Sequence, residues 1–162
     1  MIDRNEIREI RLLLLERTIL LNKLIETEVS QKISRARLKE LEKLGKQQPT
    51  AILIIGTMGE IIPSYLGLCM NMDRSSLSRM VDSLEKKGIV SRKTDLEDRR
   101  RVLISLTEKG EKYYEILQNK MEEIHASIAG VLDEQEHKEY KACIETEVRI
   151  LKKIESKLGL EG

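Results

Sequence analysis

The chain has 162 residues, of which 40% are apolar and 35% charged, so it has enough apolar material for a core and is not a disordered composition. The formal net charge is only +1, and the overall charge therefore does not by itself indicate a nucleic-acid partner. The sequence contains four tyrosines and neither phenylalanine nor tryptophan, which argues against a surface of aromatic rings that stacks on single-stranded nucleic acid.

The N-terminal part of the sequence predicts a long helix over residues 4–29, with a stripe of leucine and isoleucine wider than a single surface helix needs. Such a stripe is typical of a helix that is buried on two sides, against its own domain and against a partner chain. Residues 30–46 predict a second, shorter helix that ends at Gly45. It is basic, because the span from Lys32 to Lys46 holds six basic and two acidic residues.

The centre of the chain predicts a series of short elements. Pro49 lies near the first turn of an apolar helix over residues 51–58, and residues 60–62 predict a short strand. Pro63 begins a helix over residues 63–70, and a tight turn at 71–72 leads to the next one.

That next helix, over residues 74–87, has the clearest signals. Asp73 is a favourable N-cap and Gly88 a favourable C-terminal stop. Its apolar residues recur at i, i+3, i+4 and i+7, which predicts one buried face. They are Leu77, Met80, Val81 and Leu84.

After Gly88 the apolar period changes from 3.6 to about 2 residues, which predicts a β-hairpin with a charged tip over residues 94–101. Thr107 is expected to cap a helix that runs to about Gly130. A capping-box spacing from Asp133 to Glu136 opens a last helix, whose apolar residues follow a near-heptad spacing from Tyr140 to Leu158.

The order of helix, short turn, helix and basic hairpin predicts a winged helix-turn-helix. The predicted fold is therefore mainly α with a small β-hairpin wing, a winged helix-turn-helix embedded in a helical dimerisation scaffold. We expect residues 47–107 to form the DNA-binding lobe, and residues 1–46 and 108–162 to form the dimerisation region. The charges agree with this division, because residues 74–101 hold nine basic and five acidic side chains whereas residues 108–162 hold nine and thirteen.

The helix over residues 74–87 is predicted to enter the major groove of double-stranded DNA, with its N-terminal half toward the base edges. Small hydroxyl side chains allow a close approach there, and arginine donates in a fork to guanine or phosphate. The alternative is an ordinary capped surface helix. The candidate major-groove residues are Arg74, Ser75, Ser76, Ser78, Arg79 and Lys86.

The hairpin tip favours the DNA-binding interpretation over a charged, solvated turn. Arg99, Arg100 and Arg101 are concentrated where no core requires them, and arginine at such a tip can enter the narrow minor groove. Asp98 is poorly suited to bind phosphate. We expect it to brace the wing as the ion-pair partner of a neighbouring arginine.

The run from Asp73 to Val90, followed by Asp95-x-x-Asp98-Arg-Arg and by Leu106-Thr-x-x-Gly110, resembles the MarR family of transcriptional regulators. The resemblance extends over nearly the whole chain. It implies a homodimer whose first and last two helices form the interface, and a repressor relieved by a small ligand. It also implies that Arg100 is the minor-groove arginine and Asp98 the wing-bracing acid. A two-fold dimer with one recognition helix per chain predicts a target DNA with an inverted repeat. The sequence has no signal-peptide pattern or membrane span, so the cytoplasm is the expected compartment.

Two features depart from the family pattern. Ile62 stands where the family often has a capping serine or threonine, so Pro63 is expected to hold the start of that helix. The basic connection over residues 32–46 is longer than expected, and it either contacts DNA flanks or reshapes the ligand pocket. The absence of large aromatic residues predicts an aliphatic pocket, and its candidate lining residues, for which ordinary core packing is the alternative, are Met58, Met70, Tyr113 and Tyr114.

No cofactor or metal is expected. Cys69 and Cys143 lie 74 positions apart at apolar positions and are interpreted as small buried hydrophobic residues rather than redox sensors. His125 and His137 are the two histidines and fall on different predicted helices, which argues against zinc. No signal peptide or membrane span is recognisable. No catalytic constellation of side chains is recognisable either, so an enzyme is not expected. The competing function is a dimeric helical interaction module that does not bind DNA.

Overall fold

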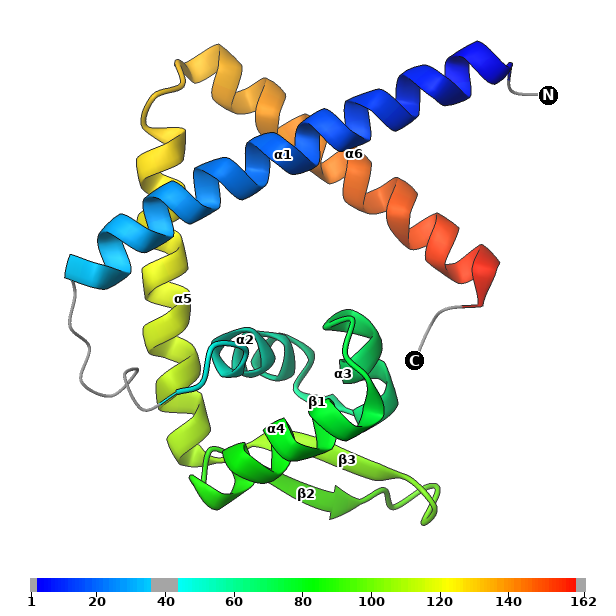
Figure 1. Ribbon diagram of the computed structural model, residues 1–162, viewed down its shortest axis with the longest axis vertical. Helices are drawn as coiled ribbons and strands as arrows, with labels where there is room; N and C mark the ends of the chain where they lie inside the picture. The colour runs from blue at the N-terminus through cyan, green and yellow to red at the C-terminus, as the bar shows by residue number, and fades with distance from the viewer. Residues whose placement is uncertain (1–2, 36–43, 160–162) are drawn as a thin grey trace.

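The computed structural model describes the backbone of residues 3–35 and 44–159 and shows a mainly helical chain with a small sheet (Figure 1). Its elements, in chain order, are α1 (Arg4–Arg35), α2 (Gln48–Met58), β1 (Glu60–Ile61), α3 (Pro63–Cys69), α4 (Arg74–Lys86), β2 (Val90–Thr94), β3 (Val102–Leu106), α5 (Glu108–Ala129) and α6 (Glu134–Leu158). The predicted fold class, mainly α with a β-hairpin wing, is confirmed.

The sheet is antiparallel with the strand order β1-β3-β2. Val90 pairs with Leu106 and Thr94 with Val102, so β2 and β3 form the predicted hairpin. The short β1 adds on the other side of β3, where Ile61 pairs with Ile104. These pairs attach the wing to the segment that precedes α3.

The main core lies beneath the sheet, between α2, α3, α4 and the start of α5. It is aliphatic, and its largest fully buried members are Ile52, Ile55, Leu66, Leu84, Ile89 and Ile104. Two glycines allow the close packing. A Cβ at Gly56 would lie 2.4 Å from the ring of Tyr114, and one at Gly110 would lie 2.1 Å from the carbonyl oxygen of Ile89.

The long helices α1, α5 and α6 extend from this lobe on the side away from the hairpin. In Figure 1, α5 rises from the lobe, and α1 and α6 cross each other above it. The Arg17 guanidinium bonds to the Glu147 carboxylate at the crossing, with Nη2 3.0 Å from Oε2. Below it, the Tyr65 hydroxyl of α3 donates to Oε1 of Glu155 on α6 at 3.2 Å, and this contact raises the pKa of Tyr65. The lobe is therefore joined to the long helices both by the continuous backbone and by the hydrogen bond between Tyr65 and Glu155.

The structure corrects the predicted end of the first helix. Residues 30–35 continue α1, and the new helix expected at residue 30 does not begin there. The reason is that neither proline nor glycine occurs in α1, so nothing interrupts its hydrogen bonding. Residues 36–43, the middle of the expected basic helix, lie outside the described residues, and Gly45 lies in the segment before α2.

The interpretation of the cysteines as buried residues is also wrong for the single chain, because both are exposed. Cys69 ends a seven-residue helix whose buried residues are Leu66 and Gly67. Cys143 lies on α6, none of whose residues is buried in the single chain.

Candidate nucleic-acid interface

The start of α4 is held by its N-cap. Asn71, with φ of 48°, turns the chain out of α3, and Asp73 then adopts an extended backbone conformation. The Asp73 carboxylate accepts the backbone N–H groups of Ser75 and Ser76, each at 3.0 Å, and the Ser75 hydroxyl at 2.7 Å. These bonds, with the Ser75 side chain first, hold the pKa of Asp73 well below its usual range.

The rest of α4 divides into a buried and an exposed face as predicted. Its four apolar residues are buried, which turns the polar residues outward. Ser76 is half-buried and lies 3.4 Å from the guanidinium of Arg79. The exposed candidates on this helix are Arg74, Ser75, Ser78, Arg79 and Lys86.

The wing tip is organised by its two aspartates. The Asp95 carboxylate accepts the N–H of Glu97 at 2.9 Å, and the Asp98 carboxylate accepts the N–H of Arg100 at 3.0 Å. The second oxygen of Asp98 lies 3.6 Å from Nε of Arg101. Asp98 thus contacts Arg100 through the backbone and Arg101 through the side chain.

A single arginine connects the wing to α4. From β2, Arg92 donates to Asp82 at 2.6 Å and to Glu85 at 2.5 Å, and both carboxylates belong to α4. Partial burial lowers the pKa of Arg92, but its hydrogen bond to Asp82 and the charge of Glu85 outweigh that effect, and the net shift is upward. Arg92 stays charged and neutralises both acids, of which Asp82 lines the groove between α4 and the wing.

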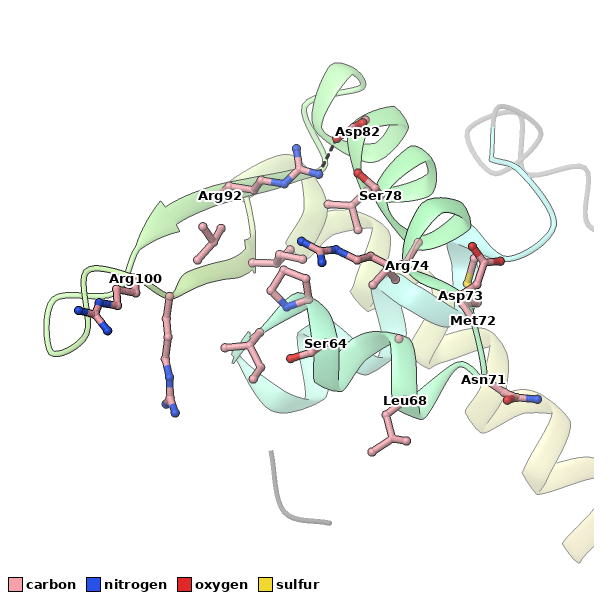
Figure 2. A pocket seen from close by; sticks show the side chains of 18 residues that line it. Ser64, Leu68, Asn71, Met72, Asp73, Arg74, Ser78, Asp82, Arg92 and Arg100 are labelled. Atoms are coloured by element: carbon pink, nitrogen blue, oxygen red, sulfur yellow. Dashed lines mark hydrogen bonds and ion pairs between the residues drawn. The ribbon is translucent and has the colours of Figure 1, made fainter. Parts of the chain in front are cut away.

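That groove lies between α3, α4 and the wing and has a volume of about 1220 Å³. Figure 2 shows Arg74 extending into it from α4, Arg92 crossing to Asp82, Arg100 at the wing tip and Ser64 on the floor. Arg101 also lines it. Four arginines, from α4, from β2 and from the hairpin tip, therefore border one open channel, whose acidic residues Asp73 and Asp82 are both hydrogen-bonded.

The predicted DNA-contacting residues do not all face this channel. Arg74, Ser78, Arg100 and Arg101 line it. Arg79 and Lys86 instead border a smaller hollow of about 390 Å³ elsewhere on α4. The remaining candidates, Ser75, Ser76, Asp98 and Arg99, line neither of these two hollows.

The four candidate pocket residues lie elsewhere, and none of them lines the arginine-bordered groove. Tyr113 is buried in the core, Met70 packs against it, and Met58 is 52% exposed. The Tyr114 hydroxyl lies 3.3 Å from Thr57 Oγ1 and accepts from Gln118 Nε2 at 2.8 Å. Their role in ligand binding stays a prediction.

Sequence reasoning missed Arg92. A usable signal existed, because Arg92 is two residues after the buried Val90 on a strand, which places both side chains on the face toward α4. Asp82 and Glu85 are three residues apart on the helix and so lie on one side of it.

Two further features bear on function. Among the residues that the structure describes, no group of three or more His, Cys, Asp or Glu side chains is placed to hold a metal ion. None of the helices within that part of the chain is both long and apolar enough to cross a bilayer.

The family assignment rests on the segment that forms most of this groove. A model of the MarR family matches residues 44–102, from just before α2 to the first residue of β3. This segment belongs to the MarR family. The MarR-family match thus includes α4, the wing tip and the strand that carries Arg92.

Individual proteins agree with this assignment. The chain is 32% identical over 93 residues to the organic hydroperoxide resistance transcriptional regulator of Bacillus subtilis, an alignment that covers 56% of this chain and 60% of that one. It spans between 57% and 60% of the length of the first two curated relatives it matches.

Solved structures extend the likeness to the helical scaffold. The DNA complex of FabT from Streptococcus pneumoniae superimposes with a TM-score of 0.63 at 21% identity, covering 89% of this chain and 97% of FabT. The transcriptional regulator PA4135 has the same TM-score at 26% identity and covers 89% and 96%. The winged helix-turn-helix within a helical scaffold is therefore the fold of the described part of the chain.

Proposed function

We propose that this chain is a transcriptional regulator and not an enzyme, which binds double-stranded DNA in the cytoplasm as a homodimer. The observation that carries the proposal is the groove bordered by Arg74, Arg92, Arg100 and Arg101, between the exposed start of one helix and a hairpin tip. This protein groove can accommodate one phosphate backbone of the duplex. The helix then enters the major groove of the DNA on one side of that backbone, and the wing enters the minor groove on the other side.

In this proposal α4 lies in the major groove. Ser75 and Ser78 are exposed and small, which lets the backbone of the helix approach the base edges closely. Arg79 and Lys86, which border the smaller hollow, contact bases or the opposite phosphate strand. Arg74 faces the backbone strand that runs through the groove, whereas Ser76 supports Arg79 from within the helix.

The wing contributes arginines to the minor groove. Within the described part of the chain, the Arg100 guanidinium makes no hydrogen bond or ion pair, while its backbone is held by Asp98. An unpaired guanidinium on a fixed backbone is suited to the negative potential of a narrow minor groove. Arg99 and Arg101 add phosphate contacts on either side.

The homodimer rests on the scaffold of residues 1–46 and 108–162. In the single chain α1 and α6 expose long rows of apolar side chains, among them Leu13 at 64% and Leu151 at 53%. Apolar faces of this length are normally buried against another protein surface. A second copy related by a two-fold axis covers both at once and presents two copies of α4.

Regulation by a small ligand completes the proposal, with the protein acting as a repressor that the ligand releases. We place the ligand between the scaffold and the lobe, near Met58, Met70, Tyr113 and Tyr114. The observation in favour is the Tyr114 hydroxyl, which together with Thr57 and Gln118 forms a polar group beside exposed Met58.

Selection of bound duplexes from a random DNA library tests the proposal. We expect an inverted repeat whose half-site centres are separated by about one helical turn of DNA, roughly 10 base pairs, because one dimer presents two symmetric helices. Enrichment of a single asymmetric site bound by one protomer would contradict the dimeric model. A dimer that enriches no sequence and does not bind duplex DNA at low salt would favour the helical interaction module instead.

A further inference from the structure

The side chain of Gln48 is the one polar side chain buried in the core among the described residues, with 6% of it exposed. Its hydrogen bonds are well formed. The carbonyl Oε1 accepts the backbone N–H of Gly45 at 3.0 Å and the ammonium of Lys87 at 2.7 Å. The amide Nε2 donates to the Ser83 hydroxyl at 3.0 Å.

These bonds join three parts of the chain. Gln48 is the first residue of α2, Gly45 belongs to the segment that reaches α2 from the direction of α1, and Ser83 and Lys87 lie one turn apart at the C-terminal end of α4. A buried amide has directional requirements that an apolar side chain lacks, because each of its polar atoms must keep a partner. One side chain therefore fixes the end of α4 in both distance and rotation.

Other contacts hold the same end. The Lys109 ammonium, at the start of α5, donates to the Lys87 carbonyl at 2.6 Å, and the Thr107 hydroxyl donates to the Gly88 carbonyl at 2.7 Å. The opposite end of α4 carries exposed Arg74 and Ser75. With 13 residues the helix is about 20 Å long, so a tilt of about 5° at the fastened end displaces the exposed end by roughly 2 Å.

We infer that Gln48 is a positioning residue for DNA recognition: it sets the orientation of α4 relative to the lobe without contacting DNA itself. This inference rests on the proposed function. Gln48 acts through Ser83 and Lys87, and its loss removes none of the exposed arginines. Removing it therefore lowers the preference for the correct sequence and half-site spacing more than it lowers the general attraction to DNA.

Four proteins test the inference in the full-length chain: wild type, Gln48→Leu, Gln48→Glu and Gln47→Leu. Leucine has a similar volume but forms none of the three bonds. Glutamate keeps the acceptor for Gly45 and Lys87, and the Ser83 hydroxyl can rotate to donate to it. Gln47 is exposed and its side chain makes no capping bond, so Gln47→Leu controls for a leucine at the adjacent position.

Affinities are measured for the selected operator, for operators with one base pair inserted or removed between the half-sites, and for scrambled duplex, each over a range of salt. We expect Gln48→Leu to bind the operator about tenfold more weakly, comparable to one mismatched base pair, with a flatter dependence on spacing and unchanged affinity for scrambled DNA. Gln48→Glu and Gln47→Leu should match wild type. Wild-type affinity and spacing preference in Gln48→Leu would overturn the inference, as would an equal loss on operator and scrambled DNA.

Hydrogen exchange gives a readout that does not depend on DNA. We expect faster exchange of the amides of residues 83–88 in Gln48→Leu than in Gln47→Leu, with the sheet amides unchanged. Equal protection of residues 83–88 in the two variants would refute the positioning role. Ser83→Ala, which removes one bond only, serves if Gln48→Leu does not fold, and it should show the same changes in weaker form. Failure of wild type to bind any duplex would count against the proposed function, whereas the exchange result decides on Gln48 separately.

Discussion

The Asp73 carboxylate accepts three hydrogen bonds from Ser75 and Ser76, and its pKa lies below the usual range for that reason. A carboxyl with a lowered pKa in the folded state stabilises the fold above its unfolded-state pKa of about 4, and that stability is lost as the pH falls through this value toward the folded pKa. The cap therefore contributes at neutral pH and weakens in acid.

Replacing Asp73 by alanine should lower the melting temperature at pH 7 and lower it less at pH 3. Asp73→Asn should keep part of the cap, since an amide oxygen also accepts N–H groups, and its smaller deficit relative to wild type should also shrink at pH 3, because wild type then begins to lose the charged cap. Thermal unfolding of the three proteins at both pH values provides the measurement. An alanine deficit of the same size at pH 3 and pH 7 would show that the charge of Asp73 is irrelevant to the cap.

Arg79 and Arg100 occupy different surfaces, one beside the smaller hollow on α4 and the other at the tip of the wing. We expect Arg79→Ala to weaken operator binding by about 1–3 kcal/mol and to relax the preference at particular base pairs. Arg100→Ala should weaken binding to many sequences and reduce the salt dependence by about one counterion, because it removes one charge near phosphate. Asp98→Ala should resemble Arg100→Ala in weaker form through the lost bond to the Arg100 backbone.

Salt titrations on operator and scrambled duplex separate these effects. If Arg100→Ala binds as tightly as wild type at every salt concentration, the wing does not touch DNA and the winged mode of binding fails.

Between elements, the wing and α4 are coupled by the ion pairs of Arg92 with Asp82 and Glu85. The pairs are partly exposed, so Arg92→Gln should change the free energy of unfolding by only about 0–1 kcal/mol. Binding should fall much further on all duplexes, because the Asp82 carboxylate would then line the groove without a compensating charge and the wing would lose its link to α4.

The matched variants are Arg92→Lys, which keeps the charge but has a single ammonium to bridge two acids, and Lys93→Gln on the neighbouring strand position, whose partner is Glu60. Duplex affinity and urea unfolding are measured for each. Arg92→Lys should bind more weakly than wild type, and Lys93→Gln should bind nearly as well as wild type. Full affinity in Arg92→Lys would mean that charge alone matters at this position.

The order of the elements from α2 onward could be predicted because several boundaries have a local cause. Asp73 and Gly88 delimit α4, Thr107 caps α5 and the box of Asp133 with Glu136 begins α6, all within a few residues of the bonds that they make. Partners distant in sequence could not be predicted. The period of β2 indicates which face holds Arg92 but not that two carboxylates meet it there.

Gln48 illustrates a second limit. Its bonds to Ser83 and Lys87 cross 35 and 39 residues, and no pattern around an isolated glutamine at a helix start indicates them. The exposure of Cys69 and Cys143 was missed for a related reason, since apolar spacing predicts a face but not whether the same chain covers it.

On the scale of the whole molecule, the apolar rows of α1 and α6 are where we expect a second protomer to pack. Leu151→Glu should give monomers and much weaker operator binding, since it introduces a charge where a partner helix is expected to pack. Lys152→Glu, one residue further along α6, is the control and should stay dimeric. Sedimentation at several concentrations checks both, and a Leu151→Glu protein that sediments as wild type would exclude this interface.

The main core takes its buried residues from the segment between Gln48 and Leu117, whereas none of the described side chains of α1 and α6 is buried in the single chain. We therefore expect the winged lobe to unfold as a unit of its own, and in the proposed homodimer the two outer helices would gain their stability by mass action from the second protomer. Calorimetry should then show one transition whose midpoint rises with protein concentration and another whose midpoint does not. Dilution alone would then unfold the outer helices and leave the lobe folded. In the proposed homodimer, the protein concentration in the cell would therefore set the fraction of molecules able to bind both half-sites of an operator at once.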